Sequence, residues 1–145
     1  MKYVALAVLF IAKPSFADFE VSISGLSGWD TKKDVISIKG EPAGKEDHLF
    51  SMYNQSYFYP GLVLSFQDDF LTSITSDAVD KCTAQNICPG DNIDEAISAY
   101  GDPYIKSYDE LVIDQYNFNE TQTDRCWYIA SVEGEIINEI SIACH

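Results

Sequence analysis

Basic residues are scarce in this chain. Its 145 residues include 9 Lys and Arg against 23 Asp and Glu, which gives a formal net charge of −14. A field of that sign repels nucleic-acid phosphates and anionic lipid surfaces, so we expect no nucleic-acid partner. The same field attracts a basic protein or a cation. The alternative, that the acidity only keeps the protein soluble, stays open at this point.

Histidine and the motifs of common enzyme classes are also nearly missing. The two histidines are His48 and His145, and no Cys-x-x-Cys spacing occurs, so the sequence does not favour a zinc site. No Gly-rich phosphate loop, dinucleotide fingerprint or Gly-x-Ser-x-Gly elbow is present. We therefore expect no enzyme and no cofactor. Calcium is the one cation that the acidic composition suits, although the segment from Asp91 to Asp94 lacks the EF-hand pattern.

A hydrophobic run long enough to span a membrane is absent as well. The apolar stretch from Tyr3 to Ala12 is well short of the ~20 residues that a spanning helix needs. Lys2 precedes it and small residues follow at Ser15 and Ala17, which is the pattern of a signal peptide over residues 1–17. The alternative is a membrane anchor. We expect cleavage after Ala17, a periplasmic or secreted mature protein, and no stable membrane anchor.

The chain has four cysteines, and all lie after the expected cleavage site. An even number in an exported protein predicts two disulfides, and four cysteines allow three pairings. We favour Cys82 with Cys88, which closes a short loop, and Cys126 with Cys144, which joins two late strands.

One sequence pattern occurs twice. The segment from Asp30 to Pro42 reappears from Asp91 to Pro103, with an Asp, a small polar residue, an acid, Ile-Ser and Gly-acid-Pro in the same order. Such a repeat indicates tandem duplication of one unit. We expect residues 18–81 and 82–145 to be the two copies, in one compact domain because the mature chain has a single domain's length.

Each copy begins with a short predicted helix. A polar N-cap is followed three residues later by an acid, as Thr31 and Asp34 in the first copy and Asn92 and Glu95 in the second. Each helix ends at a glycine that a proline follows, as Gly40 and Pro42, then Gly101 and Pro103. The apolar faces expected to pack on β-structure are Val35, Ile36 and Ile38, and Ala96, Ile97 and Tyr100.

β-Strands are predicted after each helix. The expected ranges are 48–59, 62–66 and 71–75 in the first copy, and 111–118, 125–132 and 135–143 in the second. Hairpin turns are expected between Phe66 and Leu71 and between Val132 and Ile137, and residues 82–91 form the connector. A polar insertion is expected at 117–124. Runs of strands after each helix predict an α+β fold, with an antiparallel sheet and the helices on one side.

This arrangement resembles the β-lactamase-inhibitory proteins, which are built from two tandem helix-plus-sheet units. A single unit resembles the small outer-membrane assembly lipoproteins of the SmpA/BamE type. The resemblance implies the same fold. It also implies a protein-binding role, because exported proteins of this build usually bind other proteins. The Gly-Met-Thr helix start of the lipoproteins is absent here, so no contact residue is carried over. The matching residues are Gly28, Trp29, Thr31, Val35, Gly40 and Pro42, then Gly90, Asn92, Ala96, Gly101 and Pro103.

Tyrosine is the residue type that most indicates a binding surface. Tyrosine and tryptophan dominate binding hot spots because they bury a large area at low entropic cost. Strand alternation sends about half of the aromatic residues into a core, and the rest can meet a basic partner together with nearby acids. The predicted partner-binding residues are Tyr53, Tyr57, Tyr59, Asp68, Asp69, Asn119, Glu120 and Asp124.

Three functions are compatible with these features. The first is an exported protein-binding inhibitor, such as a periplasmic immunity protein that occludes the active site of a basic toxin or cell-wall-degrading enzyme. The second is a cell-envelope assembly or scaffold module of the BamE type. The third is a hydrolase of envelope carbohydrate, which needs two carboxylates at a set separation. The acids considered for that role are Asp68, Asp69, Glu133 and Glu135.

Overall fold

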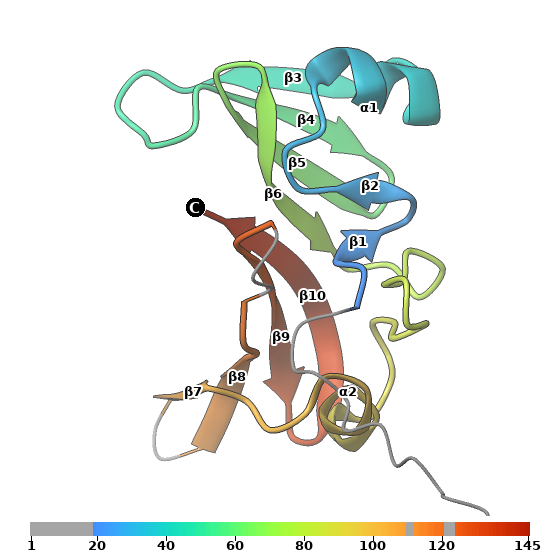
Figure 1. The fold of residues 1–145 in the computed structure, drawn as a ribbon, viewed down its shortest axis with the longest axis vertical. Coiled ribbons are helices and arrows are strands. Elements are labelled where there is room, and N and C mark those ends of the chain that lie inside the picture. The colour runs from blue at the N-terminus through green and yellow to red at the C-terminus, as the bar shows by residue number, and fades with distance from the viewer. Residues whose placement is uncertain (1–18, 110–111, 121–123) are drawn as a thin grey trace, which may run out of the picture.

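The computed structural model describes residues 19–109, 112–120 and 124–145. The predicted signal peptide and its cleavage site lie outside the described residues. In chain order the elements are β1 (Ser22–Ile23), β2 (Leu26–Ser27), α1 (Lys32–Lys39), β3 (Gly44–Asp47), β4 (Gln55–Tyr59), β5 (Leu62–Gln67), β6 (Phe70–Ser76), α2 (Ile93–Tyr100), β7 (Ile105–Asp109), β8 (Val112–Asn117), β9 (Cys126–Glu133) and β10 (Ile136–Cys144) (Figure 1).

One antiparallel sheet organises the molecule. Its eight strands lie in the order β3-β4-β5-β6-β10-β9-β8-β7, and β1 and β2 form a separate two-stranded sheet. The middle of the large sheet is the pairing of β6 with β10, where Ser73 lies opposite Ala143 and Ser76 opposite Ile140. Each helix precedes four strands of this sheet, which makes the fold mixed and rich in strands, as predicted.

Both helices begin and end at the predicted residues. Thr31 caps α1, since its hydroxyl accepts a hydrogen bond from the Asp34 N–H at 3.2 Å while the Asp34 carboxylate accepts one from the Thr31 N–H at 3.0 Å. Asn92 caps α2 by accepting from the Asp94 N–H at 2.9 Å. Gly40 and Gly101 terminate the helices at φ 78° and 88°, a region that glycine adopts without a steric penalty.

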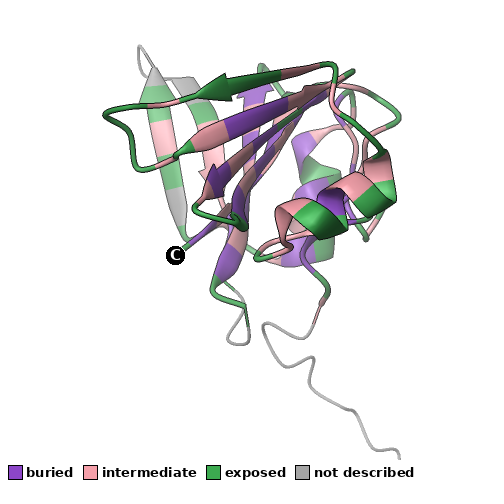
Figure 2. Cartoon of the chain, turned by 90° about the horizontal axis from the view of Figure 1, so that it is seen from above, coloured by how far each residue is buried: buried purple, intermediate pink, exposed green. Residues whose placement is uncertain are grey.

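The core lies between one face of the sheet and the helices. Alternate residues of β5 and β9 are buried, and on β10 the buried positions shift phase at a bulge between Ile137 and Glu139. Figure 2 shows these buried positions along the central strands and on parts of the helices. Val35 is the buried residue of α1, whereas α2 buries Ile93, Ala96 and Tyr100. Ile38 was expected on the packed face of α1 but is half exposed.

Two buried tyrosines connect the first described residues to the second half of the sheet. Tyr128 on β9 stacks on Tyr100 of α2 with ring centroids 4.5 Å apart. The Tyr128 hydroxyl accepts from the Ser22 N–H at 2.9 Å, and the Tyr100 hydroxyl shares a hydrogen bond with Thr83. Burial raises the pKa of both hydroxyls above the ordinary value for tyrosine, so both remain neutral donors and acceptors at physiological pH.

The two disulfides pair as predicted. Cys82 is bonded to Cys88 in the connector, and Cys126 to Cys144 across β9 and β10. Gly28 lies directly on the second disulfide, because a Cβ placed there would be 2.3 Å from the Cys144 sulfur and 2.4 Å from the Cys126 sulfur. A glycine is therefore required at position 28 by the close approach of the backbone to the sulfurs.

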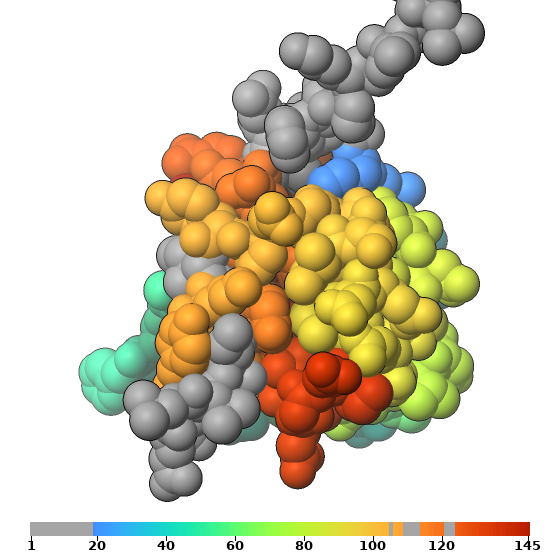
Figure 3. Space-filling view, turned by 90° about the horizontal axis from the view of Figure 1, so that it is seen from below, coloured from blue at the N-terminus to red at the C-terminus, as the bar shows by residue number. Residues whose placement is uncertain are grey.

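The sequence predicts one continuous strand over residues 48–59, and this prediction is wrong. Strand β4 covers Gln55–Tyr59, residues 48–54 are a loop, and the partner strand β3 was not predicted. Strand β7 was also missed. Seen from below in Figure 3, α2 lies beside the β7–β8 segment, and the chain around residue 50 projects at the left edge. Among the described residues, no helix is long and apolar enough to cross a membrane.

Candidate functional site

Most of the predicted partner-binding residues meet at one end of the large sheet. Antiparallel register places the start of β4, the turn between β5 and β6, the end of β8, the start of β9 and the end of β10 at the same end. We call it the Cys144 end. It carries Tyr53, Asp68 and Asp69 on one half of the sheet, and Asn119, Glu120 and Asp124 on the other. The structure thus places these six residues, which come from two distant parts of the sequence, at the same end of the sheet.

The loop of residues 48–54 projects from this end, between β3 and β4 (Figure 1). Its apolar side chains contact almost nothing: Leu49 is 87% exposed, Met52 is 70% exposed and Phe50 is fully exposed. Exposed apolar residues that lie next to one another mark interaction surfaces, whereas isolated ones do not. We call this segment the apolar loop.

The base of the apolar loop is held in place although its tip is not packed. His48 N–H donates to the Asn54 carbonyl at 2.9 Å, and Asn54 N–H donates to the Phe66 carbonyl at 2.8 Å. The Asn54 side chain also accepts from the Asp68 N–H at 2.6 Å, which ties the loop to the β5–β6 turn. The tip is therefore presented from a defined position.

Acidic residues surround the apolar loop. Glu46 and Asp47 precede it on β3, and Asp68 and Asp69 lie in the neighbouring turn; all four are exposed. Two lysines are nearby: the ammonium group of Lys45 lies 5.0 Å from the centre of the Tyr57 ring, and that of Lys32 lies 5.6 Å from the centre of the Phe66 ring. The edge around the apolar tip is thus mainly negative.

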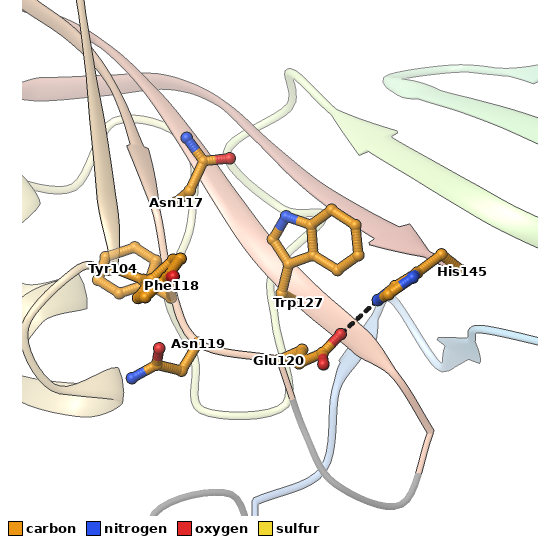
Figure 4. Close-up of a pocket in the computed structure, with 7 residues that line it drawn as sticks. All are labelled: Tyr104, Asn117, Phe118, Asn119, Glu120, Trp127 and His145. Atoms are coloured by element: carbon orange, nitrogen blue, oxygen red, sulfur yellow. Dashed lines mark hydrogen bonds and ion pairs between the residues drawn. The ribbon is translucent and has the colours of Figure 1, made fainter.

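A hollow of about 480 Å³ occupies the other half of the Cys144 end. Figure 4 shows Tyr104 and Phe118 on one side and Trp127 on the other, with the polar side chains along the edges. Tyr104 is 77% exposed and Phe118 is buried, so the hollow reaches from the surface to the core. We call it the aromatic hollow. Its lining residues are Tyr104, Asn117, Phe118, Asn119, Glu120, Trp127 and His145.

Contacts along the rim fix the shape of the aromatic hollow. His145 lies edge-on to Trp127 with ring centroids 5.3 Å apart, and its Nε2 pairs with the Glu120 carboxylate. Trp29 Nε1–H donates to the Asp124 carbonyl at 2.7 Å, which connects the turn between β2 and α1 to the segment before β9. The carboxylate of Glu120 therefore already has a partner.

Two predicted tyrosines lie elsewhere. Tyr57 is only 5% exposed and its ring packs on Phe66 at 4.7 Å, so it belongs to the core and not to the predicted surface. Tyr59 lies at the opposite end of β4 and donates from its hydroxyl to the Gly40 carbonyl at 2.7 Å, which holds the end of α1. Burial raises the pKa of Tyr59 above its ordinary value.

The acids considered for hydrolysis are not brought together. Asp68 and Asp69 lie in the β5–β6 turn at the Cys144 end, while Glu133 and Glu135 lie at the β9–β10 turn at the opposite end. The described part of the chain contains no group of three or more His, Cys, Asp or Glu positioned to hold a metal ion. The pair Asp68 and Asp69 therefore does not face the pair Glu133 and Glu135.

Sequence reasoning missed the apolar tip and most of the aromatic hollow. Leu49, Phe50 and Met52 had been assigned to a strand, where alternate residues would be buried. The signal was present, because the polar residues His48, Ser51 and Asn54 interrupt the apolar pattern. The sequence carries no signal that groups Tyr104 with Trp127, since their common position depends on the pairing of β8 with β9.

Comparisons with known proteins give a likeness of fold only. No family model and no curated protein matches the chain. A DUF4309 family protein, YjgB, from Bacillus subtilis subsp. subtilis str. 168 is 15% identical with a TM-score of 0.49, over 79% of this chain and 78% of that one. An extracellular protein containing a SCP domain from Bacillus anthracis str. Ames is 5% identical with a TM-score of 0.50, over 80% of this chain. The match covers 43% of that protein, so this chain corresponds to less than half of its length.

Proposed function

We propose that this chain is an exported protein-binding inhibitor whose apolar loop enters an apolar cleft with a basic rim on a toxin or cell-wall-degrading enzyme. The observation that carries the proposal is the exposure of three adjacent apolar side chains, Leu49, Phe50 and Met52, on a loop with a fixed base. Its mechanism is occlusion, in which the loop occupies the cleft and excludes the substrate.

The energy for binding comes from burying the loop tip. Complete burial of a Leu, Phe or Met side chain stabilises a complex by about 1.5–3 kcal/mol each. A loop whose base is already hydrogen-bonded loses less conformational entropy on docking than a flexible one does. The anchoring of Asn54 to Phe66 and Asp68 therefore favours tight binding.

Charge supports a basic partner. The exposed carboxylates of Glu46, Asp47, Asp68 and Asp69 surround the loop, and the whole chain carries a formal charge of −14. Complementary charge increases the association rate and excludes acidic proteins, and salt weakens both effects. We therefore expect an association rate that falls steeply with ionic strength.

The two disulfides support export to an oxidising compartment, here the periplasm or the exterior, because such bonds rarely persist in the cytosol. A signal peptide over residues 1–17 is part of the same proposal.

We also propose that the chain is a duplicated unit, as the resemblance to β-lactamase-inhibitory proteins implies. Both helix starts are tied to a hairpin in the same way. Lys32 N–H donates to the Asp69 carbonyl at 3.1 Å, and Ile93 N–H to the Glu135 carbonyl at 2.8 Å. This equivalence supports two copies of one structural plan.

The test is a direct comparison of loop variants. The partner is first isolated by cross-linking in the cell envelope of the source organism, then purified for calorimetry and for an assay of its own activity. We expect the wild type to abolish that activity. The double variant F50S/M52S should weaken binding about 100-fold or more, from the lost burial of two apolar side chains.

Val79→Ser is the matched control, because Val79 is 72% exposed but follows β6 at the opposite end of the sheet. It should bind and inhibit like the wild type. Unchanged binding by F50S/M52S would overturn the assignment of the loop. A partner that stays fully active in the complex, with the protein held in the outer-membrane fraction, would favour the BamE-type scaffold instead.

A further inference from the structure

We propose that the aromatic hollow is a binding site for a neutral saccharide. The proposal does not depend on the apolar loop, which lies on the other half of the Cys144 end. A volume of about 480 Å³ falls within the range of about 300–1,000 Å³ for small-ligand sites. Such sites combine an aromatic or apolar lining with a few convergent polar groups, which is what the aromatic hollow provides.

The chemistry of the lining favours a sugar ring over other small ligands. A pyranose has apolar C–H faces and hydroxyl groups around its edge, so it needs flat aromatic surfaces beside donors and acceptors. Tyr104 and Trp127 supply the exposed aromatic surfaces, Phe118 is a buried part of the lining, and no aliphatic side chain lines the hollow among the described residues. A fatty or aliphatic ligand would therefore find no matching lining.

The polar groups supply both donors and acceptors for hydroxyls. The side-chain amides of Asn117 and Asn119 can each donate and accept, and the Glu120 carboxylate accepts. Figure 4 shows these side chains at the edges of the hollow, around the space between Tyr104 and Trp127. A ring held between the aromatic groups would present its hydroxyls to them.

Charge restricts the saccharide to a neutral one. The Glu120 carboxylate is paired with the His145 imidazole, so this side chain is less available to a cationic ligand. The net charge of −14 repels acidic saccharides. Neutral hexose or N-acetylhexosamine units satisfy both conditions.

The experiment is calorimetric titration of the full mature protein with chitotriose, cellotriose and maltotriose. Sialyllactose serves as the anionic probe and choline as the cationic one. We expect one of the neutral trisaccharides to bind and neither charged probe to bind. Tyr104→Ala and Trp127→Ala should each raise the Kd about tenfold or more, by removal of one aromatic surface.

Tyr108→Ala is the control, because Tyr108 is 62% exposed on β7 but does not line the hollow. Its Kd should match that of the wild type. Tyr104 is exposed, so its replacement tests the site even if Trp127→Ala, beside a disulfide, fails to fold. No binding of any neutral trisaccharide, binding of choline or sialyllactose alone, or an unchanged Kd in Tyr104→Ala would overturn the proposal.

Discussion

At the scale of single residues, Gly28 is a position at which one added carbon should be strongly damaging. A Cβ there would overlap both sulfurs of the Cys126–Cys144 disulfide. We expect Gly28→Ala to destabilise the protein by about 1–3 kcal/mol, as overpacking does, or to prevent the disulfide from forming. Thermal unfolding and titration of free thiols measure the two outcomes.

Gly44→Ala provides the comparison. A Cβ at Gly44 would meet the Phe58 ring at 3.7 Å, which is an ordinary contact. This variant should therefore unfold close to the wild type. Equal stability of Gly28→Ala and Gly44→Ala, with the disulfide intact in both, would contradict the close packing at position 28.

Glu139 lowers the free energy of unfolding in a pH-dependent way. Partial burial raises the pKa of its carboxyl group above the ordinary value, and the nearby Asp77 adds to the shift. For a carboxyl group with a raised pKa the charged form is disfavoured, so the cost is present above that pKa and disappears as the pH falls below it. Glu139→Gln should therefore raise the free energy of unfolding at pH 7, by less than about 1 kcal/mol because the site is partly solvated.

Urea unfolding at pH 7 and at pH 4 distinguishes an effect of the Glu139 charge from an effect of packing. The difference between Glu139→Gln and the wild type should shrink at the lower pH. Glu135→Gln, at an exposed position before β10, should show no comparable gain at pH 7. A difference for Glu139→Gln that is the same at both pH values would show that it arises from packing and not from charge.

At the scale of elements, α1 depends on its cap more than α2 does. Helix α1 buries Val35 alone, whereas α2 is held by Ile93, Ala96 and Tyr100. Short helices have little stability of their own, so the capping hydrogen bonds of Thr31 matter. We expect Thr31→Ala to lower the free energy of unfolding by about 1 kcal/mol, measured by urea denaturation.

Ser37→Ala is the control for this prediction, because Ser37 lies exposed in the middle of α1 and takes no part in the cap. Alanine has a higher helix propensity than serine, so this variant should be as stable as the wild type or slightly more stable. A loss in Ser37→Ala equal to that in Thr31→Ala would mean that the cap has no special role.

At the scale of the whole molecule, features that depend on local sequence could be predicted, whereas long-range strand pairing could not. The caps, the helix-ending glycines and the hairpin turns depend on a few consecutive residues, and they were predictable. Strands β3 and β7 were missed because Gly44–Asp47 and Ile105–Asp109 carry little apolar alternation and pair only at the sheet edges. The pairing of β6 with β10, which joins the two halves, has no local signature.

Those parts of the candidate site that depend on local composition could be predicted, and those that depend on strand pairing could not. Polar segments such as Asn119, Glu120 and Asp124 were recognised as surface from composition. Tyr57 was assigned to the surface because the orientation of each residue in a strand depends on register, and only the pairing of β4 with β5 decides it. The aromatic hollow needs β7, β8, β9 and β10 in place before Tyr104 and Trp127 face a common space.

The amino-acid sequence by itself determined the helix boundaries, the mixture of helices and strands and the acidity, because each depends on residue type or on short spacing. The tertiary structure alone decided which aromatic residues are exposed and which distant segments share the Cys144 end. The physical reason is that strand register and sheet order come from the simultaneous burial of many side chains. No single stretch of the chain contains that information.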